Sequence, residues 1–331
     1  MSDIIYRSET IADYSGIAGL VYDAFMDWRQ ADYKVEPLVV DFLRHCPLFD
    51  PDLSLVAERD GCLVGHALFT PFEFIVMGSR QRGLVLAPLC VAPPWQRQGV
   101  GEALMRRGHE IAQSKGYVLS ILCGHPSYYP RFGYLQRMFS LSGCQVHLEA
   151  ECSGGVDGIS GCYQERPVLS ADMPWITELW MERHSADSLA LYPGECISQW
   201  FNHTQHGHAS VILQGRQPTA YVRYRASDPL AVKELLVKGD QAGPLLSWLL
   251  AKHHHRTTGD LSLTLSEEAA QALLAGYEGA SVTPDRHASE AFMLKVLDEQ
   301  NQAVAEYCAA VQSGALEPGI INFPATLDID G

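Results

Sequence analysis

Basic residues are scarce in this sequence, where 24 Lys and Arg stand against 39 Asp and Glu and give a formal charge of −15. A field of that sign repels nucleic-acid phosphates and anionic membrane surfaces. Long apolar runs are also missing, because the most apolar stretch, Leu84–Trp95, is too short to span a bilayer and is interrupted by prolines. The sequence therefore predicts no nucleic-acid partner, no membrane span and, with no basic-then-apolar start, no signal peptide.

Paired cysteine motifs are absent as well. None of the nine cysteines forms a C-x-x-C pair, which argues against zinc sites and a disulfide framework and favours reduced thiols in the cytoplasm. Two histidine groups could suggest a metal, but their spacing is not that of a tetrahedral site, so no metal is predicted. These groups are His203, His206 and His208, and His253, His254 and His255.

What is present fits a folded protein of two domains. Apolar residues make up 47% of the 331 residues and charged residues 19%, a composition typical of globular chains. In the first region, strands are expected at Ile4–Arg7 and Leu84–Val91, and an Asp60-Gly61 turn predicts a hairpin. A long helix is expected after Pro94, ending near the Lys115-Gly116 pair.

An internal repeat supports a duplication. Five residues of the first half recur 159 positions later, and the order of expected strands and helices also recurs. The matching residues are Arg7, Ala12, Asp13, Ile17 and Leu20 in the first half, and Arg166, Ala171, Asp172, Ile176 and Leu179 in the second.

The segment after the strand at Leu84–Val91 carries the chemistry. A short loop with Gly99 and Gly101 opens a helix, where successive backbone N–H groups form an anion cradle favoured by the helix dipole. Arg97 adds positive charge, and a pyrophosphate suits such a cradle. The segment is neither a Walker A loop nor a dinucleotide fingerprint, because the required Lys and third glycine are missing.

These residues resemble the GNAT family of acetyl-coenzyme A-dependent N-acetyltransferases. The family's Q/R-x-x-G-x-G/A signature is matched by residues 96–101, and a second family element, Tyr-x-R-F-G-F/Y, is similar to the run Tyr129–Tyr134. The resemblance implies that acetyl-CoA is the cosubstrate and that it is bound by Leu89, Cys90, Val91, Gln96, Arg97, Gln98, Gly99, Val100 and Gly101.

The resemblance also implies the fold class, which is α/β (α+β). Two GNAT-like domains are expected, each a mixed, mostly antiparallel twisted sheet with a splayed central parallel pair flanked by helices. The expected boundaries are 1–150 for the catalytic domain, 151–162 for a linker, 163–298 for a degenerate copy, and 299–331 for a C-terminal helix and tail. The copy is degenerate because residues 238–241 leave no room for the cradle.

In this family, two strands splay apart and unpaired backbone groups hold the pantetheine arm. The resemblance implies that Leu89 and Val91 act through their backbone, and that an amide near Cys90 or Val91 polarises the thioester carbonyl. Tyr129 aligns with the frequent general acid that protonates the leaving thiolate, whereas Tyr128 is expected to pack. Cys90 invites an acyl-enzyme hypothesis, but packing is favoured because the sequence shows no histidine partner for it.

The general base is harder to assign. Some family members carry a Glu where this chain has Val85, so that assignment fails. Glu73 is the nearest acidic alternative, although an exposed strand charge is an equally good interpretation. A water chain, or carboxylates from the segment Asp328–Gly331, would also serve.

The favoured function is a direct acetyl transfer, in a ternary complex, to the primary amine of a small cationic molecule. Two alternatives stay open: acetylation of a protein lysine or N-terminus, and an acyl-CoA sensor or scaffold without turnover. The second domain could shape the acceptor cleft or form a homo-oligomer interface.

Overall fold

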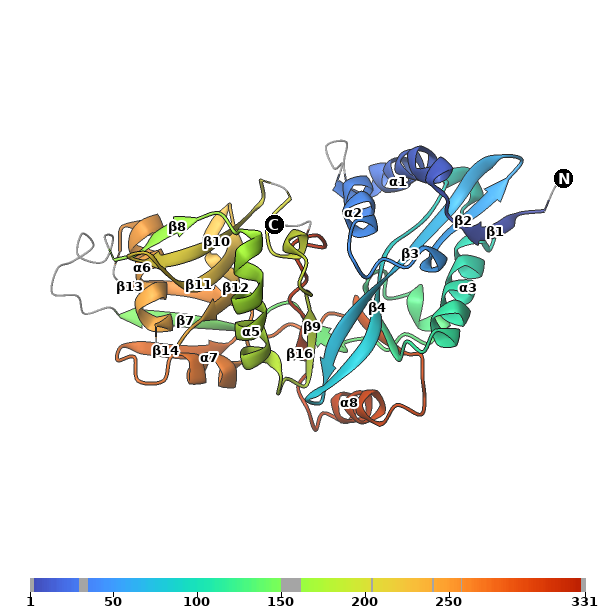
Figure 1. The fold of residues 1–331 in the computed structure, drawn as a ribbon. Coiled ribbons are helices and arrows are strands. Elements are labelled where there is room, and N and C mark those ends of the chain that lie inside the picture. The colour runs from blue at the N-terminus through green and yellow to red at the C-terminus, as the bar shows by residue number, and fades with distance from the viewer. Residues whose placement is uncertain are drawn as a thin grey trace. The chain divides into compact units, whose positions relative to one another are not determined.

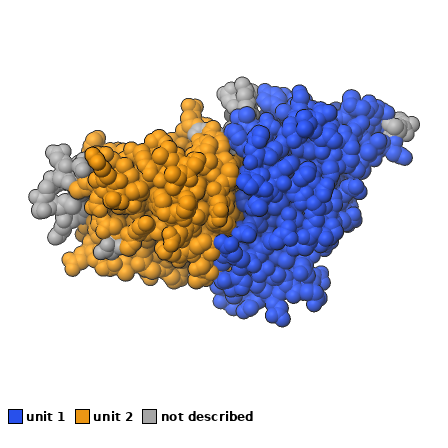
Figure 2. Space-filling view, in the orientation of Figure 1, with its two compact units in different colours: residues 1–138, 289–317 blue, residues 139–288, 318–331 orange. Residues whose placement is uncertain are grey.

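The computed structural model describes residues 3–29, 35–149, 162–203, 205–239, 241–256 and 258–328 (Figure 1). The expected linker, which included residues 152–161 rich in Gly and Ser, lies almost entirely outside the described residues. The chain divides into two units (Figure 2). Unit 1 contains residues 1–138 and 289–317, and unit 2 contains residues 139–288 and 318–331.

Unit 1 is built on a sheet in the order β1-β2-β3-β4-β5-β15. Every neighbouring pair in this order is antiparallel except β4–β5, which is parallel. The mixed α/β fold with one central parallel pair is confirmed. The strands are Ile5–Ser8, Ser54–Arg59, Cys62–Val76, Ser79–Val91, Leu119–Cys123 and Phe292–Val296; the helices are α1 (Tyr14–Arg29), α2 (Val35–Arg44), α3 (Val100–Ser114) and α8 (Gln302–Gln312).

Local sequence explains the hairpin and the helix that position the site. Asp60 and Gly61 both have positive φ, 52° and 79°, as a two-residue turn between β2 and β3 requires. Helix α3 is followed by Gly116 at φ 75°, a left-handed position that ends the helix where the sequence predicts. Gly108 lets α3 approach β3 closely, because a Cβ at this position would lie 2.2 Å from the Phe69 ring.

Unit 2 repeats the plan with a sheet in the order β14-β7-β13-β12-β11-β10-β8. Its one parallel pair is β12–β13, which corresponds in chain order to β4–β5. The strands of this sheet are β7 (Cys144–Glu149), β8 (Gln164–Arg166), β10 (Gly207–Gln214), β11 (Gln217–Arg225), β12 (Asp228–Val237), β13 (Thr258–Leu263) and β14 (Ala280–Pro284). The helices are α5 (Met173–His184), α6 (Ala242–His254) and α7 (Glu267–Leu273). Three further strands lie outside this sheet and are β6 (Phe139–Ser140), β9 (Leu189–Tyr192) and β16 (Gly319–Ile320).

The repeat detected in the sequence has a structural basis. Arg7 binds the carboxylate of Asp13 through two nitrogens at 2.7 and 2.8 Å, and the Thr10 amide donates to the same carboxylate. In unit 2, Arg166 binds Asp172 at 2.7 Å through two nitrogens, and the Leu169 amide donates to it. The first set joins β1 to the start of α1 and the second joins β8 to the start of α5, so the duplication extends to side-chain interactions.

The unit boundaries differ from the expected domain boundaries. The chain enters unit 2 after Met138, returns to unit 1 at Ser289 and leaves it again after Glu317. Strand β7 pairs with β13 and β14 of the later sheet, whereas β15 pairs with β5 of the earlier one. Each sheet therefore includes a strand from the other half of the chain, a long-range pairing that local sequence patterns do not encode.

The C-terminal segment is anchored in unit 2. Asp328 accepts from Arg223 at 2.5 Å and is also paired with Lys233. Arg223 also donates to Asn322 and to the Phe323 carbonyl. The expectation that residues 328–331 add carboxylates near the reacting nitrogen concerns mostly residues outside the described ones, and Asp328 itself is held by these two cations.

Replacing Asp328 with asparagine is expected to lower the free energy of unfolding of unit 2 by about 3–5 kcal/mol, because it removes the counter-charge of two largely buried cations. Urea unfolding followed by tryptophan fluorescence measures the change. The control is Glu290→Gln, which breaks the exposed Arg137–Glu290 pair and is expected to cost at most about 1 kcal/mol. Equal effects of the two substitutions would contradict an anchoring role for Asp328.

Within the described residues, no helix is both long enough and apolar enough to cross a membrane.

Candidate functional site

Strands β4 and β5 separate along half of their length. Their parallel pairing runs from Gly83–Leu119 to Val85–Ile121, and β4 then continues to Val91 with no further partner on β5. A bulge in β4 accompanies the separation, because the register against β3 shifts between Leu86 and Leu89. Bulges bend a strand and end its pairing, so the edge of β4 beyond Val85 is left open.

The orientation of the β4 backbone at this opening follows from one hydrogen bond. The Ala92 amide donates to the Val64 carbonyl of β3 at 3.0 Å. Backbone groups alternate in direction along an antiparallel strand, so those of Cys90 also face β3, whereas those of Leu89 and Val91 face the open edge. Leu89 and Val91 therefore direct backbone groups toward the splay, and the amide of Cys90 does not.

The loop between β4 and α3 forms the predicted cradle. Arg97 and Gly99 both adopt left-handed backbone conformations, with φ of 61° and 84°, and the side chains of residues 96–99 are exposed. The first helical amide with a carbonyl partner is that of Ala103, which donates to Gly99. In this fully described segment, the amides of Val100, Gly101 and Glu102 have no internal acceptor, so they are available to an anion at the positive end of α3.

Two side chains of the loop hold the cradle in shape. Gln96 donates to the Val91 carbonyl at 3.2 Å, and Gln98 donates to the Pro94 carbonyl at 2.8 Å. These glutamines brace the loop with their side chains, which leaves binding to the backbone. A Cβ added to Gly99 would meet no atom within 4 Å, so the space in front of this residue is open.

Tyr128 and Tyr129 lie next to this site with their rings edge to face, 5.0 Å apart. The hydroxyl of Tyr128 lies 2.8 Å from where a Cβ of Gly101 would be, so Tyr128 reaches the start of α3. The Tyr129 ring packs over Gly124, and burial raises the pKa of its phenol well above the usual value, with smaller contributions from Tyr128 and Cys90. Tyr129 is therefore a protonated phenol at neutral pH.

Glu73 is not brought to the splay. It pairs with Arg82 near the far end of the β3–β4 hairpin, and its carboxylate lies 3.4 Å from Arg80 with 40% of the side chain exposed. Ala67, the partner of Leu89, precedes Glu73 on β3 by about 20 Å at the usual rise of a strand. A role for Glu73 as the base is not supported by this placement.

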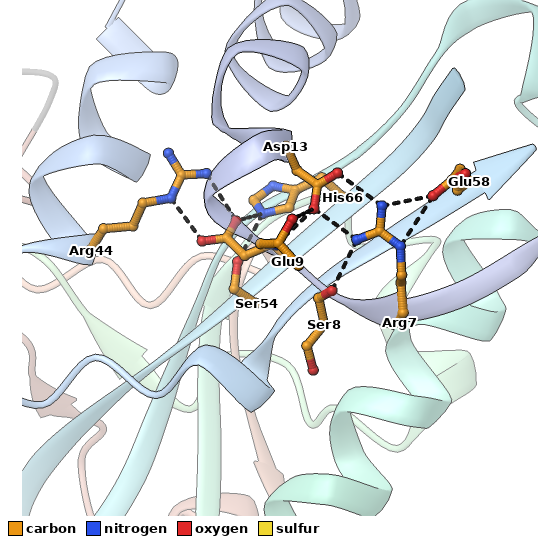
Figure 3. A network of polar contacts seen from close by, with 9 residues as sticks. Arg7, Ser8, Glu9, Asp13, Arg44, Ser54, Glu58 and His66 are labelled. Atoms are coloured by element: carbon orange, nitrogen blue, oxygen red, sulfur yellow. Dashed lines mark hydrogen bonds and ion pairs between the residues drawn. The ribbon is translucent and has the colours of Figure 1, made fainter. Parts of the chain in front are cut away.

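Sequence reasoning missed a buried polar network around His66 of β3, which is shown in Figure 3. His66 lies opposite Cys90 in the register and is completely buried. Its Nε2 is 3.1 Å from the Ser54 hydroxyl and 3.6 Å from the Glu9 carboxylate, which Arg44 binds through two nitrogens at 2.8 and 2.9 Å. These residues come from separate elements, and no sequence motif joins them.

Cys90 is itself buried, and burial raises the pKa of its thiol to about 12. A thiol with so high a pKa is a poor nucleophile at neutral pH. This supports the packing interpretation over an acyl-enzyme.

Unit 2 offers no comparable anion cradle in its described part. Only residues 238–241 separate β12 from α6, against residues 92–99 between β4 and α3. A cavity of about 630 Å³ does occur in unit 2, but its lining has no basic residue. The lining residues are Ser170, Met173, Pro174, Thr177, Glu195 and Ile197.

Two of the unit 2 histidines that could suggest a metal contact other protein groups instead. His203 contacts the Ser198 carbonyl at 2.7 Å, and His208 pairs with Glu165 at 3.3 Å. Among the described residues, no three His, Cys, Asp or Glu side chains are placed to hold a metal ion.

The match to a known family falls in unit 1. The family described as "Acetyltransferase (GNAT) domain" matches residues 6–136. The Escherichia coli K12 protein named "Uncharacterized N-acetyltransferase YjhQ" is 43% identical over 125 residues, which are 37% of this chain and 65% of YjhQ, so the chain covers just under two thirds of that relative. "Uncharacterized N-acetyltransferase YhbS" from the same strain is 32% identical over 132 residues, which are 40% of this chain and 73% of YhbS.

A solved structure extends the likeness to both units. The crystal structure of a GCN5-related N-acetyltransferase from Kribbella flavida matches 89% of this chain and 71% of its own, with a TM-score of 0.59 and 19% identity. At this identity the match concerns the fold alone. The residues matched by the family model, 6–136, include the splayed strands and the cradle.

Proposed function

The chain belongs to the GNAT family of acetyltransferases, and on that premise we propose that it transfers acetyl from acetyl-CoA to the primary amine of a small cationic molecule. The observation that carries the proposal is the combination of an open β4 edge with a cradle of free amides at the start of α3. YhbS, the relative at 32% identity, has been crystallised in complex with CoA.

The residues present fit acetyl-CoA. The amides of residues 100–102 and the charge of Arg97 suit the pyrophosphate, and the outward backbone groups of Leu89 and Val91 suit an amide-bearing arm lying along β4. Gln96, Gln98, Gly99 and Gly101 keep the cradle open. When bound, acetyl-CoA supplies an acetyl group activated as a thioester.

The chain's own groups supply the remaining chemistry. An outward amide at Leu89 or Val91 donates to the carbonyl oxygen where negative charge develops, which is oxyanion-type stabilisation. The phenol of Tyr129, protonated and buried, can donate its proton to the leaving sulfur. Because the Cys90 thiol is buried and protonated, direct attack by the amine is favoured over an acyl-cysteine.

The acceptor class is proposed from charge. The chain carries a formal charge of −15, so its overall field attracts a cationic acceptor. Coenzyme A release, followed with a thiol reagent across a panel of alkylamines, arylalkylamines and lysine peptides, tests this. Turnover confined to the lysine peptides would contradict a small acceptor, and acetyl-CoA binding without turnover on any amine would contradict an enzyme.

Acetyl-CoA is expected to bind at one site per chain, because only unit 1 has the cradle among the described residues. Isothermal titration calorimetry of the full chain measures the stoichiometry. Gly239→Glu, which alters the short loop of unit 2 at φ 60°, serves as a control and is expected to leave the binding unchanged. Two equivalent sites, or loss of binding in this control, would contradict the assignment to unit 1.

A further inference from the structure

The buried network of Figure 3 contains a histidine close to the splayed strands. We infer that His66, held by Glu9 and Ser54 and facing Cys90 across β3 and β4, accepts the proton that the acceptor amine loses during acetyl transfer. The inference rests on the proposed function and supplies the base that neither Val85 nor Glu73 provides.

His66 lies beside the part of β4 that has separated from β5. Residues directly opposite each other in an antiparallel pair project from the same face, so the imidazole and the Cys90 side chain share a face of the sheet. Cys90 belongs to the part of β4 that has separated from β5. His66 lies on β3, one strand away from the open edge of β4, and neighbouring strands in a sheet are about 4.8 Å apart. One or two water molecules bridge such a distance.

The contacts of Nε2 determine which tautomer His66 adopts. Nε2 faces the Glu9 carboxylate and the Ser54 hydroxyl, and a carboxylate can only accept. The network therefore assigns the proton to Nε2 and the lone pair to Nδ1. Burial opposes ionisation of Glu9, but hydrogen bonds with His66, Arg44 and Ser54 together lower its pKa to about 2, so its charge is present at neutral pH.

The other ring nitrogen of His66 is an unused acceptor. Nδ1 is buried and has no hydrogen-bond partner. Thr70 follows His66 by four residues on β3 and projects from the same face. Its hydroxyl is also buried and has no hydrogen-bond partner. Thr70 lies opposite Val85, the residue at which the pairing of β4 with β5 ends. Buried polar atoms in folded proteins nearly always have partners. Two orphaned atoms beside the splay indicate that a polar ligand or water completes this face.

The charges around His66 suit a base that gives up its proton after each turnover. The ionisable groups facing it are Glu9, Arg44 and the Cys90 thiol, and Ser54 adds a hydroxyl. Burial and, to a smaller extent, the charge of Arg44 together lower the pKa of His66 by more than Glu9 raises it. The imidazole is therefore neutral before the reaction, and Glu9 stabilises the cation while it exists.

The protons balance over one turnover. A neutral amine attacks the acetyl carbon, its N–H bond breaks, and an N–H bond forms at Nδ1 of His66 through water. The C–S bond breaks, and the sulfur takes the proton of the Tyr129 hydroxyl. The imidazolium then returns its proton through water to the tyrosinate; His66 lies opposite Cys90 in the register, and Tyr129 interacts electrostatically with the same thiol. No other reactant is consumed.

His66→Gln is the direct test. We expect kcat with the best amine of the panel to fall about 100-fold, while calorimetric binding of acetyl-CoA stays within twofold. The loss of kcat is expected to become smaller as pH rises, because hydroxide then replaces the missing base. We also expect the variant to lack the acidic limb of the profile of kcat against pH. That profile is measured with the most weakly basic amine that the enzyme accepts. The control is His109→Gln, another buried histidine of unit 1, which is expected to keep the wild-type pH profile.

Two measurements do not depend on that variant folding. In ¹⁵N NMR spectra of the wild-type chain, His66 is expected to show a protonated Nε2 and a bare Nδ1; the reverse tautomer would overturn the inference. Ser54→Ala keeps the imidazole and is expected to move the acidic limb of the kcat profile without changing acetyl-CoA binding. An unmoved limb would count against His66. If wild type turns over but the His66→Gln profile equals it, only the base assignment fails, whereas a wild type inactive on every amine overturns the proposed function as well.

Discussion

Gly99→Glu is expected to abolish acetyl-CoA binding, with a loss of at least about 1,000-fold in affinity. Gly99 has φ of 84°, a conformation that L residues rarely adopt, so the substitution disturbs the cradle backbone. The new side chain would also enter the open space in front of the α3 amides, where its carboxylate competes with the pyrophosphate for the same donors. Isothermal titration calorimetry with acetyl-CoA measures the effect.

The same helix provides a matched control. Gly116 follows α3 with φ of 75° and has no atom within 4 Å of an added Cβ, so Gly116→Glu introduces a similar strain and the same charge at the opposite end. It is expected to lower stability slightly, through the strain and an unfavourable charge near the helix C-terminus, and to bind acetyl-CoA normally. Equal losses of binding in both variants would mean that strain, and not the position in the cradle, explains the effect.

Features that depend on a few consecutive residues were predictable from the sequence. The Asp60-Gly61 hairpin and the Gly116 terminus follow from glycine's access to positive φ, and the cradle follows from the spacing of Gly99 and Gly101. The repeat identified Arg7 and Asp13 as residues that recur 159 positions later, but it did not show that they form an ion pair.

Features that depend on distant residues were not predictable. Strand β7 comes before the helices of unit 2 in the chain but belongs to the sheet of unit 2, and β15 belongs to the sheet of unit 1. Such pairings depend on the whole fold and not on local sequence. The network around His66 has the same origin, since Glu9, Arg44 and Ser54 meet only after β1, α2 and β2 are in place. Glu73 was the nearest acidic alternative because it lies on the strand before the cofactor strand, but the long hairpin places it away from the splay.

Tyr129→Phe is expected to lower kcat by about 100- to 10,000-fold while leaving the affinity for acetyl-CoA within twofold, because the hydroxyl acts on the leaving sulfur and not on binding. No hydrogen bond to another group is found for this hydroxyl in its fully described surroundings, so removing it should not change the melting temperature. Tyr134 is the matched contrast: its hydroxyl is bonded to Ser120 at 2.8 Å and to His109 at 3.2 Å. Tyr134→Phe should therefore lower the melting temperature and retain most of the turnover. Steady-state kinetics and thermal unfolding of both variants separate the two roles, and wild-type turnover in Tyr129→Phe would transfer the acid role to Tyr128 or to solvent.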